Sequence, residues 1–133
     1  MREIFFRGKR FDNGEWVYGD LLTKDKNGNY CPRIKNSESY PFSFQVDPTT
    51  VGQYTGAIDK NGNKIFEGDI LYPISKRPYL VFWDKENVKF ALKNSRDFCL
   101  NFYQNIADEY IVIGNMYDNP ILLKSGLLGR SKV

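Results

Sequence analysis

The sequence contains no histidine, and this single absence removes several chemistries. Without imidazole there is no histidine-activated nucleophile, no common general base for neutral pH, and no zinc site with a histidine ligand. Cysteine is nearly absent as well: Cys31 and Cys99 lie far apart, and no CxxC pair occurs. We expect two reduced, packed thiols, with Cys99 in the core, and a disulfide only if the fold brings the two together.

Long hydrophobic runs are missing too. The longest, Tyr79–Trp83 and Tyr110–Ile113, have the length of a strand and not the ~18–20 residues of a membrane span. The first residues are basic and lack the apolar segment of a signal peptide. These features predict a cytoplasmic protein that has no membrane partner.

The motifs that hold nucleotides or build a hydrolase elbow do not occur in the sequence. There is no GxxxxGK[ST], no GxGxxG and no GxSxG, and no serine has an SxxK spacing. We therefore expect no enzymatic activity, no catalytic residue, no cofactor and no metal site.

Aromatic residues are plentiful, at 16% of the chain, and they favour strands. Asn-Gly pairs, the strongest short signal for a hairpin turn, occur at 13–14, 27–28 and 61–62, each between strand-like runs. The pattern predicts a mainly β fold of short antiparallel strands and hairpins. At most one short helix is expected, near 96–106, with Ser95 as its cap and Phe98, Phe102 and Ile106 on one side. A strand is the alternative for this stretch.

Two small barrel-like lobes would accommodate these strands, at 1–47 and 50–123, the second of them SH3-like, followed by a tail at 124–133. A single compact domain is the alternative. The final strand, 110–117, should break at Gly114.

The pentapeptide Asp-Lys-Asn-Gly-Asn occurs twice, at 25–29 and 59–63, and resembles the start of an EF-hand loop. The later positions of that motif do not match, so both copies are interpreted as hairpin turns. A longer pattern, Asn-Gly followed by Gly-Asp and an aliphatic residue, also occurs twice. It has two open interpretations: a hairpin that recurs, or two related subdomains. The residues assigned to structural turns are Asn13, Gly14, Gly19, Asp20, Asn61, Gly62, Gly68 and Asp69.

The formal net charge is +3, and it is unevenly distributed. Both ends of the chain are basic, whereas residues 11–123 hold 12 basic and 15 acidic side chains. A nucleic-acid-binding domain usually carries a basic face across its body, and the sequence does not show one.

Eight segments of the sequence form a specific set: MREIFFRGKR at 1–10, WVYGDL at 16–21, VDP at 46–48, TVGQYTG at 50–56, DKNG at 59–62, IFEGDI at 65–70, IGNMYDNP at 113–120 and LL at 122–123. Together these segments resemble the YopX family of phage and prophage proteins of Gram-positive bacteria. Their order along the chain, over about residues 1–123, matches the family, although Tyr110–Ile113 stands where the family favours an acidic residue. The resemblance implies a largely β, self-associating protein of a phage or prophage, and no known activity.

We therefore predict a non-enzymatic protein that acts through protein–protein contacts as a homo-oligomer. The alternative is a small β-barrel that binds nucleic acid, because basic and aromatic residues interleave in two clusters. In the first cluster Arg7 and Lys9 should point to one face of a strand, with Gly8 leaving a gap for a partner or an anion. The candidate partner- or anion-binding residues are Arg7, Lys9, Arg10, Lys76, Arg77 and Trp83.

Overall fold

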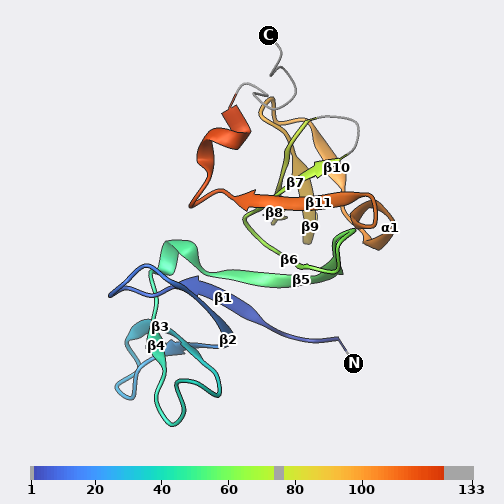
Figure 1. Ribbon diagram of the computed structural model, residues 1–133. Coiled ribbons are helices and arrows are strands. Elements are labelled where there is room, and N and C mark those ends of the chain that lie inside the picture. Colours follow the sequence, from blue (N-terminus) through green and yellow to red (C-terminus); the bar gives the residue numbers. More distant parts are fainter. Residues whose placement is uncertain (1, 74–76, 125–133) are drawn as a thin grey trace. The chain divides into compact units, whose positions relative to one another are not determined.

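The computed structural model describes residues 2–73 and 77–124 (Figure 1). The chain divides into two compact units, Met1–Tyr54 and Thr55–Val133. Both consist of antiparallel strands, which confirms the predicted mainly β fold. The expected tail at 124–133 falls outside the described residues, apart from its first residue.

The N-terminal unit contains most of a six-stranded sheet with the order β4-β3-β2-β1-β5-β6. Its core consists of three buried side chains, Val17, Ile34 and Val46, with partly buried apolar residues packed around them. A short 3₁₀ turn leads into β5, which carries the chain into the C-terminal unit. The strands are β1 (Phe6–Lys9), β2 (Trp16–Lys24), β3 (Tyr30–Lys35), β4 (Phe44–Gln45), β5 (Gly52–Ile58) and β6 (Lys64–Phe66), and the 3₁₀ turn is η1 (Pro48–Thr50).

The surroundings of Gly8 in β1 differ from the gap that we expected beside this glycine. A Cβ atom placed on Gly8 would lie 3.1 Å from the Cβ of Val46, so the space beside this glycine is filled by the protein's own core. The gap that we assigned to a partner or an anion does not exist. Glycine is needed here because β1 and Val46 approach each other closely.

The C-terminal unit holds a five-stranded sheet with the order β10-β9-β8-β7-β11. Its core includes Leu71, Val81 and Leu92 from three adjacent strands, together with Ala107. The register of β11 shifts between Val112 and Gly114, at the break that the sequence predicts. The elements are β7 (Asp69–Pro73), β8 (Tyr79–Asp84), β9 (Lys89–Lys93), β10 (Cys99–Asn101), α1 (Gln104–Ala107) and β11 (Tyr110–Asn115).

The two Asp-Lys-Asn-Gly-Asn segments fold into the same turn. In each, one carboxylate oxygen of the first residue accepts the N–H groups two and four residues later, at 2.8–2.9 Å. The glycine takes a positive φ, +83° at Gly28 and +86° at Gly62. These local hydrogen bonds explain why the pentapeptide closes a hairpin in two different places.

A third copy of this turn replaces the start of the predicted helix. The Asn94 side-chain oxygen accepts the N–H groups of Arg96 and Phe98, and Asp97 has the positive φ, +60°. The chain then continues as β10, so Ser95 caps no helix and Cys99 is exposed instead of lying in the core. The short helix that does form, α1, begins only at Gln104.

Among the described residues, no helix has the length and apolar character that crossing a membrane requires.

Candidate interaction surface

The strand register of the N-terminal unit brings basic and aromatic side chains to one face of the sheet. Arg7 and Lys9 of β1 lie opposite Tyr18 and Trp16 of β2. Directly opposed residues of antiparallel strands, and residues two apart in one strand, share a face. The other face carries the core residues. From the same register, further members of this face are Asp20 and Leu22 of β2, Arg33 and Lys35 of β3, and Gln45 of β4.

Arg7 and Lys9 both lie over the ring of Trp16. The guanidinium carbon of Arg7 is 4.6 Å from the ring centroid, and Nζ of Lys9 is 5.6 Å from it. Arg7 is only 5% exposed, whereas Lys9 is half-buried. The cation–π contact with Trp16 offsets part of the hydration that Arg7 loses on burial. Arg7 therefore packs as part of the sheet and is not simply a surface charge.

Two hollows flank Lys35 on the same unit. One, of about 540 Å³, is lined by Asp20, Lys35, Asn36, Ser37 and Tyr40. The other, of about 370 Å³, is lined by Leu22, Arg33, Lys35, Pro41, Phe42, Ser43 and Gln45. Lys35 lines both, and its Nζ lies 5.4 Å from the centroid of the Tyr40 ring.

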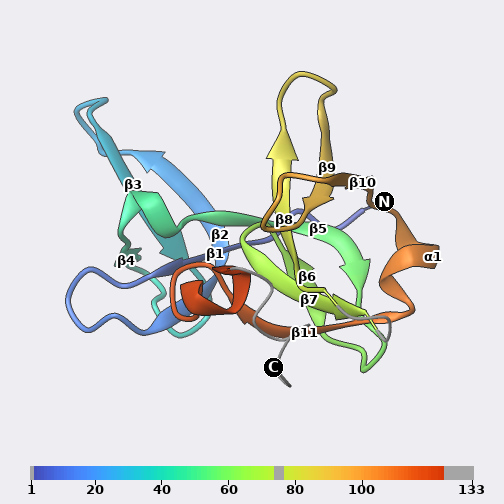
Figure 2. The same cartoon turned by 90° about the horizontal axis from the view of Figure 1, so that it is seen from above.

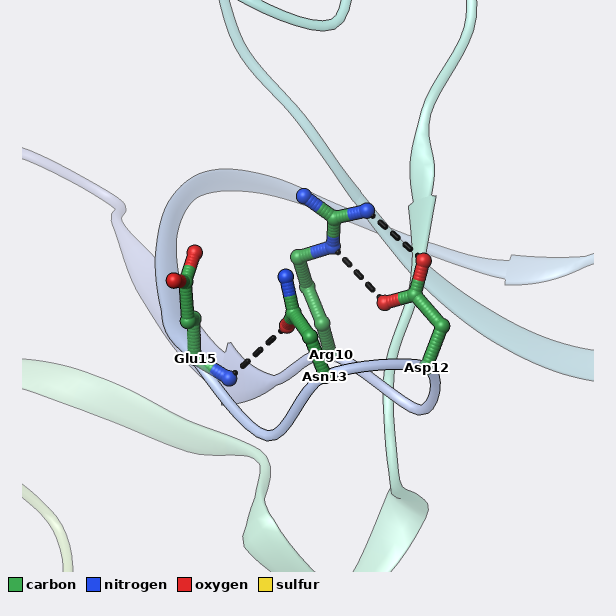
Figure 3. Close-up of polar contacts among 4 residues, drawn as sticks. All are labelled: Arg10, Asp12, Asn13 and Glu15. Atoms are coloured by element: carbon green, nitrogen blue, oxygen red, sulfur yellow. Dashed lines mark hydrogen bonds and ion pairs between the residues drawn. The ribbon is translucent and has the colours of Figure 1, made fainter.

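Arg10 belongs to the other side of β1, as the alternation of the strand predicts. Its guanidinium carbon lies 4.5 Å from the centroid of the Phe44 ring. It also donates two hydrogen bonds to Asp12, at 3.0 and 2.7 Å (Figure 3). The hydrogen bond with Asp12 raises the pKa of Arg10, and the same bond lowers the pKa of Asp12.

The turn after Arg10 is stabilised locally. Asn13 accepts the N–H of Glu15 through its side-chain oxygen, and Gly14 has a φ of +73° (Figure 3). Arg10 therefore has one partner within its own hairpin, Asp12, and a second in β4, Phe44.

Gly19-Asp20 and Gly68-Asp69 occupy different kinds of position. Gly19 and Asp20 lie inside β2, where a Cβ atom on Gly19 would collide with the carbonyl oxygen of Lys35. Gly68 and Asp69 lie at the start of β7, where the buried Asp69 carboxylate accepts the N–H of Phe66 at 2.7 Å. Asp20 is exposed beside Lys35, so the two aspartates do not have equivalent surroundings.

Trp83 lies in β8 of the C-terminal unit, edge-on to Phe90 of β9 with ring centroids 5.0 Å apart. Arg77 is exposed just before β8, and Lys76 lies outside the described residues. Figure 2 shows β8 and β9 as the two arms of a hairpin. Its turn is held by Asp84, whose pKa is lowered first by the side-chain amide of Asn87 and then by backbone N–H groups.

The sequence-based reasoning missed Arg33, Lys35, Tyr40 and Phe42. A signal was present for each pair. Arg33 and Lys35 flank the buried Ile34 in an alternating strand, and Tyr40 and Phe42 flank a proline in a polar loop, where large aromatic residues have no core to enter. No group of three or more potential metal ligands occurs within 2–73 and 77–124.

A comparison with protein families matches residues 5–124 to the model of the YopX protein. The chain belongs to the YopX family. It is also similar to protein EF1440 from Enterococcus faecalis, known from a crystal structure, at 27% sequence identity and a TM-score of 0.57. That similarity covers 93% of this chain and 100% of the other. No functionally curated protein matches the sequence significantly.

Proposed function

We propose that this chain is a non-enzymatic binding protein that assembles with copies of itself through the β8–β9 hairpin. It would be encoded by a phage or prophage and would work in the cytoplasm of the bacterial host, as the resemblance to the YopX family implies. Its non-enzymatic character rests on the sequence, which has no histidine and none of the nucleotide-binding or hydrolase motifs. The assembly surface rests on Val88.

Val88 is unusual in both its backbone conformation and its exposure to solvent. Its φ is +56°, a left-handed conformation that suits glycine or asparagine and strains a β-branched residue. Its side chain is also 71% exposed, so the hairpin gains almost nothing from burying it. Strain of this kind costs about 1–3 kcal/mol, and residues held in such conformations cluster at functional sites. A partner that covers Val88 would account for both features.

A second copy of the chain suits this hairpin. Val88 and the exposed Trp83 offer apolar surface, while Lys85 and Glu86 place opposite charges side by side in the turn. In a two-fold symmetric interface each lysine can meet the glutamate of the other copy, so a patch with both charges is complementary to itself.

Light scattering coupled to size-exclusion chromatography tests the proposal, at protein concentrations from one to one hundred micromolar. We expect the unmodified protein to be an oligomer and Val88→Gly to dissociate at higher concentration, while its unfolding temperature stays equal or rises because the strain is relieved. Tyr103→Ser is the matched control, since it removes an exposed aromatic residue of the same unit outside the hairpin. A monomeric unmodified protein, or an unchanged Val88→Gly oligomer, would refute the proposal.

A further inference from the structure

We propose that the basic and aromatic face of the N-terminal unit binds single-stranded nucleic acid, with Tyr40 and Phe42 stacking on bases and Lys35 and Arg33 contacting phosphates. The stacking and phosphate-contacting residues of this site are not those of the β8–β9 hairpin, and these four residues lie outside both clusters singled out by the sequence.

The aromatic component is the loop between β3 and β4. Phe42 is 78% exposed and Tyr40 is 73% exposed, which makes them the two most exposed large hydrophobic residues of the described chain. Each ring lines its own hollow, and Pro41 separates them. Flat rings displayed at hollows in this way are the stacking surfaces that proteins offer to unpaired bases, and they accept any base because every base has a π-face.

The basic component lies between the two rings. Lys35 lines both hollows, so its ammonium group can reach the phosphate that joins two bases lying in them. Arg33, two residues earlier on the same face, donates hydrogen bonds to the carbonyl oxygens of Lys24, at 2.7 Å, and Cys31, at 3.4 Å. These bonds fix the guanidinium along the strand, and a prepositioned cation loses little freedom on binding.

Charge complementarity selects the occupant. Of the residues that the strand register places on this face, Lys9, Arg33 and Lys35 are basic and partly exposed, Arg7 is basic and buried, and Asp20 is acidic. An anionic polymer is the partner that such a face attracts, and steering by its field acts before any contact forms.

The rings distinguish a single strand from other polyanions. A duplex keeps its bases stacked on each other and would leave Tyr40 and Phe42 without a partner, whereas a single strand exposes base faces to them. An acidic peptide could pair with Lys35 and Arg33, but it has no flat base to stack on the rings of Tyr40 and Phe42.

Fluorescence anisotropy with a labelled 20-nucleotide oligo-dT, its duplex with oligo-dA, and poly-glutamate as competitor tests this proposal. We expect tight binding of the single strand only, with an affinity that falls as salt rises. Phe42→Ser and Tyr40→Ser should each weaken binding roughly five-fold or more with little effect on the salt dependence, because stacking involves no counterion release. Lys35→Gln should weaken binding and reduce the salt slope by about 0.7.

Two further variants sharpen the test. Asp20→Asn should tighten binding of the single strand and leave the preference over the duplex intact, since it removes the acid that lies opposite Lys35. Lys26→Gln is the control for loss of charge alone, because Lys26 is exposed in the β2–β3 turn away from both hollows. Val88→Gly should bind the oligonucleotide as well as the unmodified subunit does, which separates this site from self-association.

Equal binding of duplex, effective competition by poly-glutamate, or indifference to both Tyr40→Ser and Phe42→Ser would overturn the proposal. So would the absence of binding at low salt, even if the protein assembles as proposed above.

Discussion

Val112 donates its backbone N–H to the Asp59 carboxylate at 2.9 Å, which ties the β5–β6 turn to strand β11. Asp59 is 3% exposed and accepts two more backbone N–H groups, from Asn61 and Asn63. Burial on its own would raise the pKa of this carboxyl, but the N–H groups of Val112, Asn63 and Asn61 outweigh burial and hold the pKa below its ordinary value.

Asp59→Asn should therefore destabilise the protein, and Asp25→Asn should not. In the wild-type turn, one oxygen of Asp59 accepts the N–H groups of Asn61 and Asn63, and the other accepts the N–H of Val112. An asparagine has a single oxygen, so its NH₂ group would face the N–H of Val112 and that hydrogen bond would be lost. We expect the free energy of unfolding in urea to fall by about 2 kcal/mol. Asp25 forms the same turn with two hydrogen bonds to one oxygen and no bond to another strand, so its replacement should cost less than about 0.5 kcal/mol. Equal losses would contradict this explanation.

Acid should remove the contribution of Asp59. Because the folded-state pKa is below the unfolded value of about 3.9, the charged carboxylate stabilises the fold fully above that pH, and the stabilisation disappears as the pH falls through the folded-state pKa. Unfolding measured between pH 7 and pH 2 should show a steeper loss for the unmodified protein than for Asp59→Asn. Parallel curves below pH 4 would show that other carboxylates dominate.

Gly8→Ala should overpack the N-terminal core. The new methyl group would lie 3.1 Å from the side chain of Val46, and forcing extra atoms into a packed core costs about 1–3 kcal/mol. Val46→Ala removes two of the three crowding atoms, Cγ1 and Cγ2, and leaves the Cβ in place. In the double variant, Gly8→Ala should therefore cost less than it does alone, as a double-mutant cycle in urea would reveal. Strictly additive losses would mean that the glycine is needed for another reason.

Asp97→Gly should stabilise the C-terminal unit. Asp97 has a φ of +60° at the position where the two related turns have Gly28 and Gly62. Glycine adopts this conformation without steric strain, and we expect a gain of about 0.5–1 kcal/mol in thermal or urea unfolding. The reverse change, Gly62→Ala, should cost about 1 kcal/mol or more. A loss of stability in Asp97→Gly would indicate that the aspartate side chain has a role of its own.

Local chemistry explains which parts of the fold were predictable. The Asp-Lys-Asn-Gly-Asn turns depend on hydrogen bonds within five residues, and the break in β11 depends on one glycine, so the sequence around each contains the necessary information. The short helix predicted near 96–106 forms, but only from Gln104, and the reason is local as well. Asn94, one residue before the expected cap Ser95, accepts the N–H groups of Arg96 and Phe98 and closes a turn instead.

The surface could not be predicted in this way. Lys35 meets Asp20, and Arg33 meets Leu22, only because β2 and β3 pair in one particular register. Lys35 reaches the Tyr40 ring only because the loop after β3 folds back toward it. Contacts of this kind depend on pairing between separate strands, and no short stretch of sequence specifies them.

The bond between Asp59 and Val112 has a further consequence for how molecules of this protein meet. β11 is the last strand of its sheet, and a last strand offers unpaired N–H and C=O groups to which a strand of another molecule can add, which is how fibrous aggregates begin. Here the N–H of Val112 is bound by Asp59, and the C=O of Tyr110 accepts the N–H of Lys60 at 2.9 Å. The turn thus protects the β11 edge of the sheet against such growth.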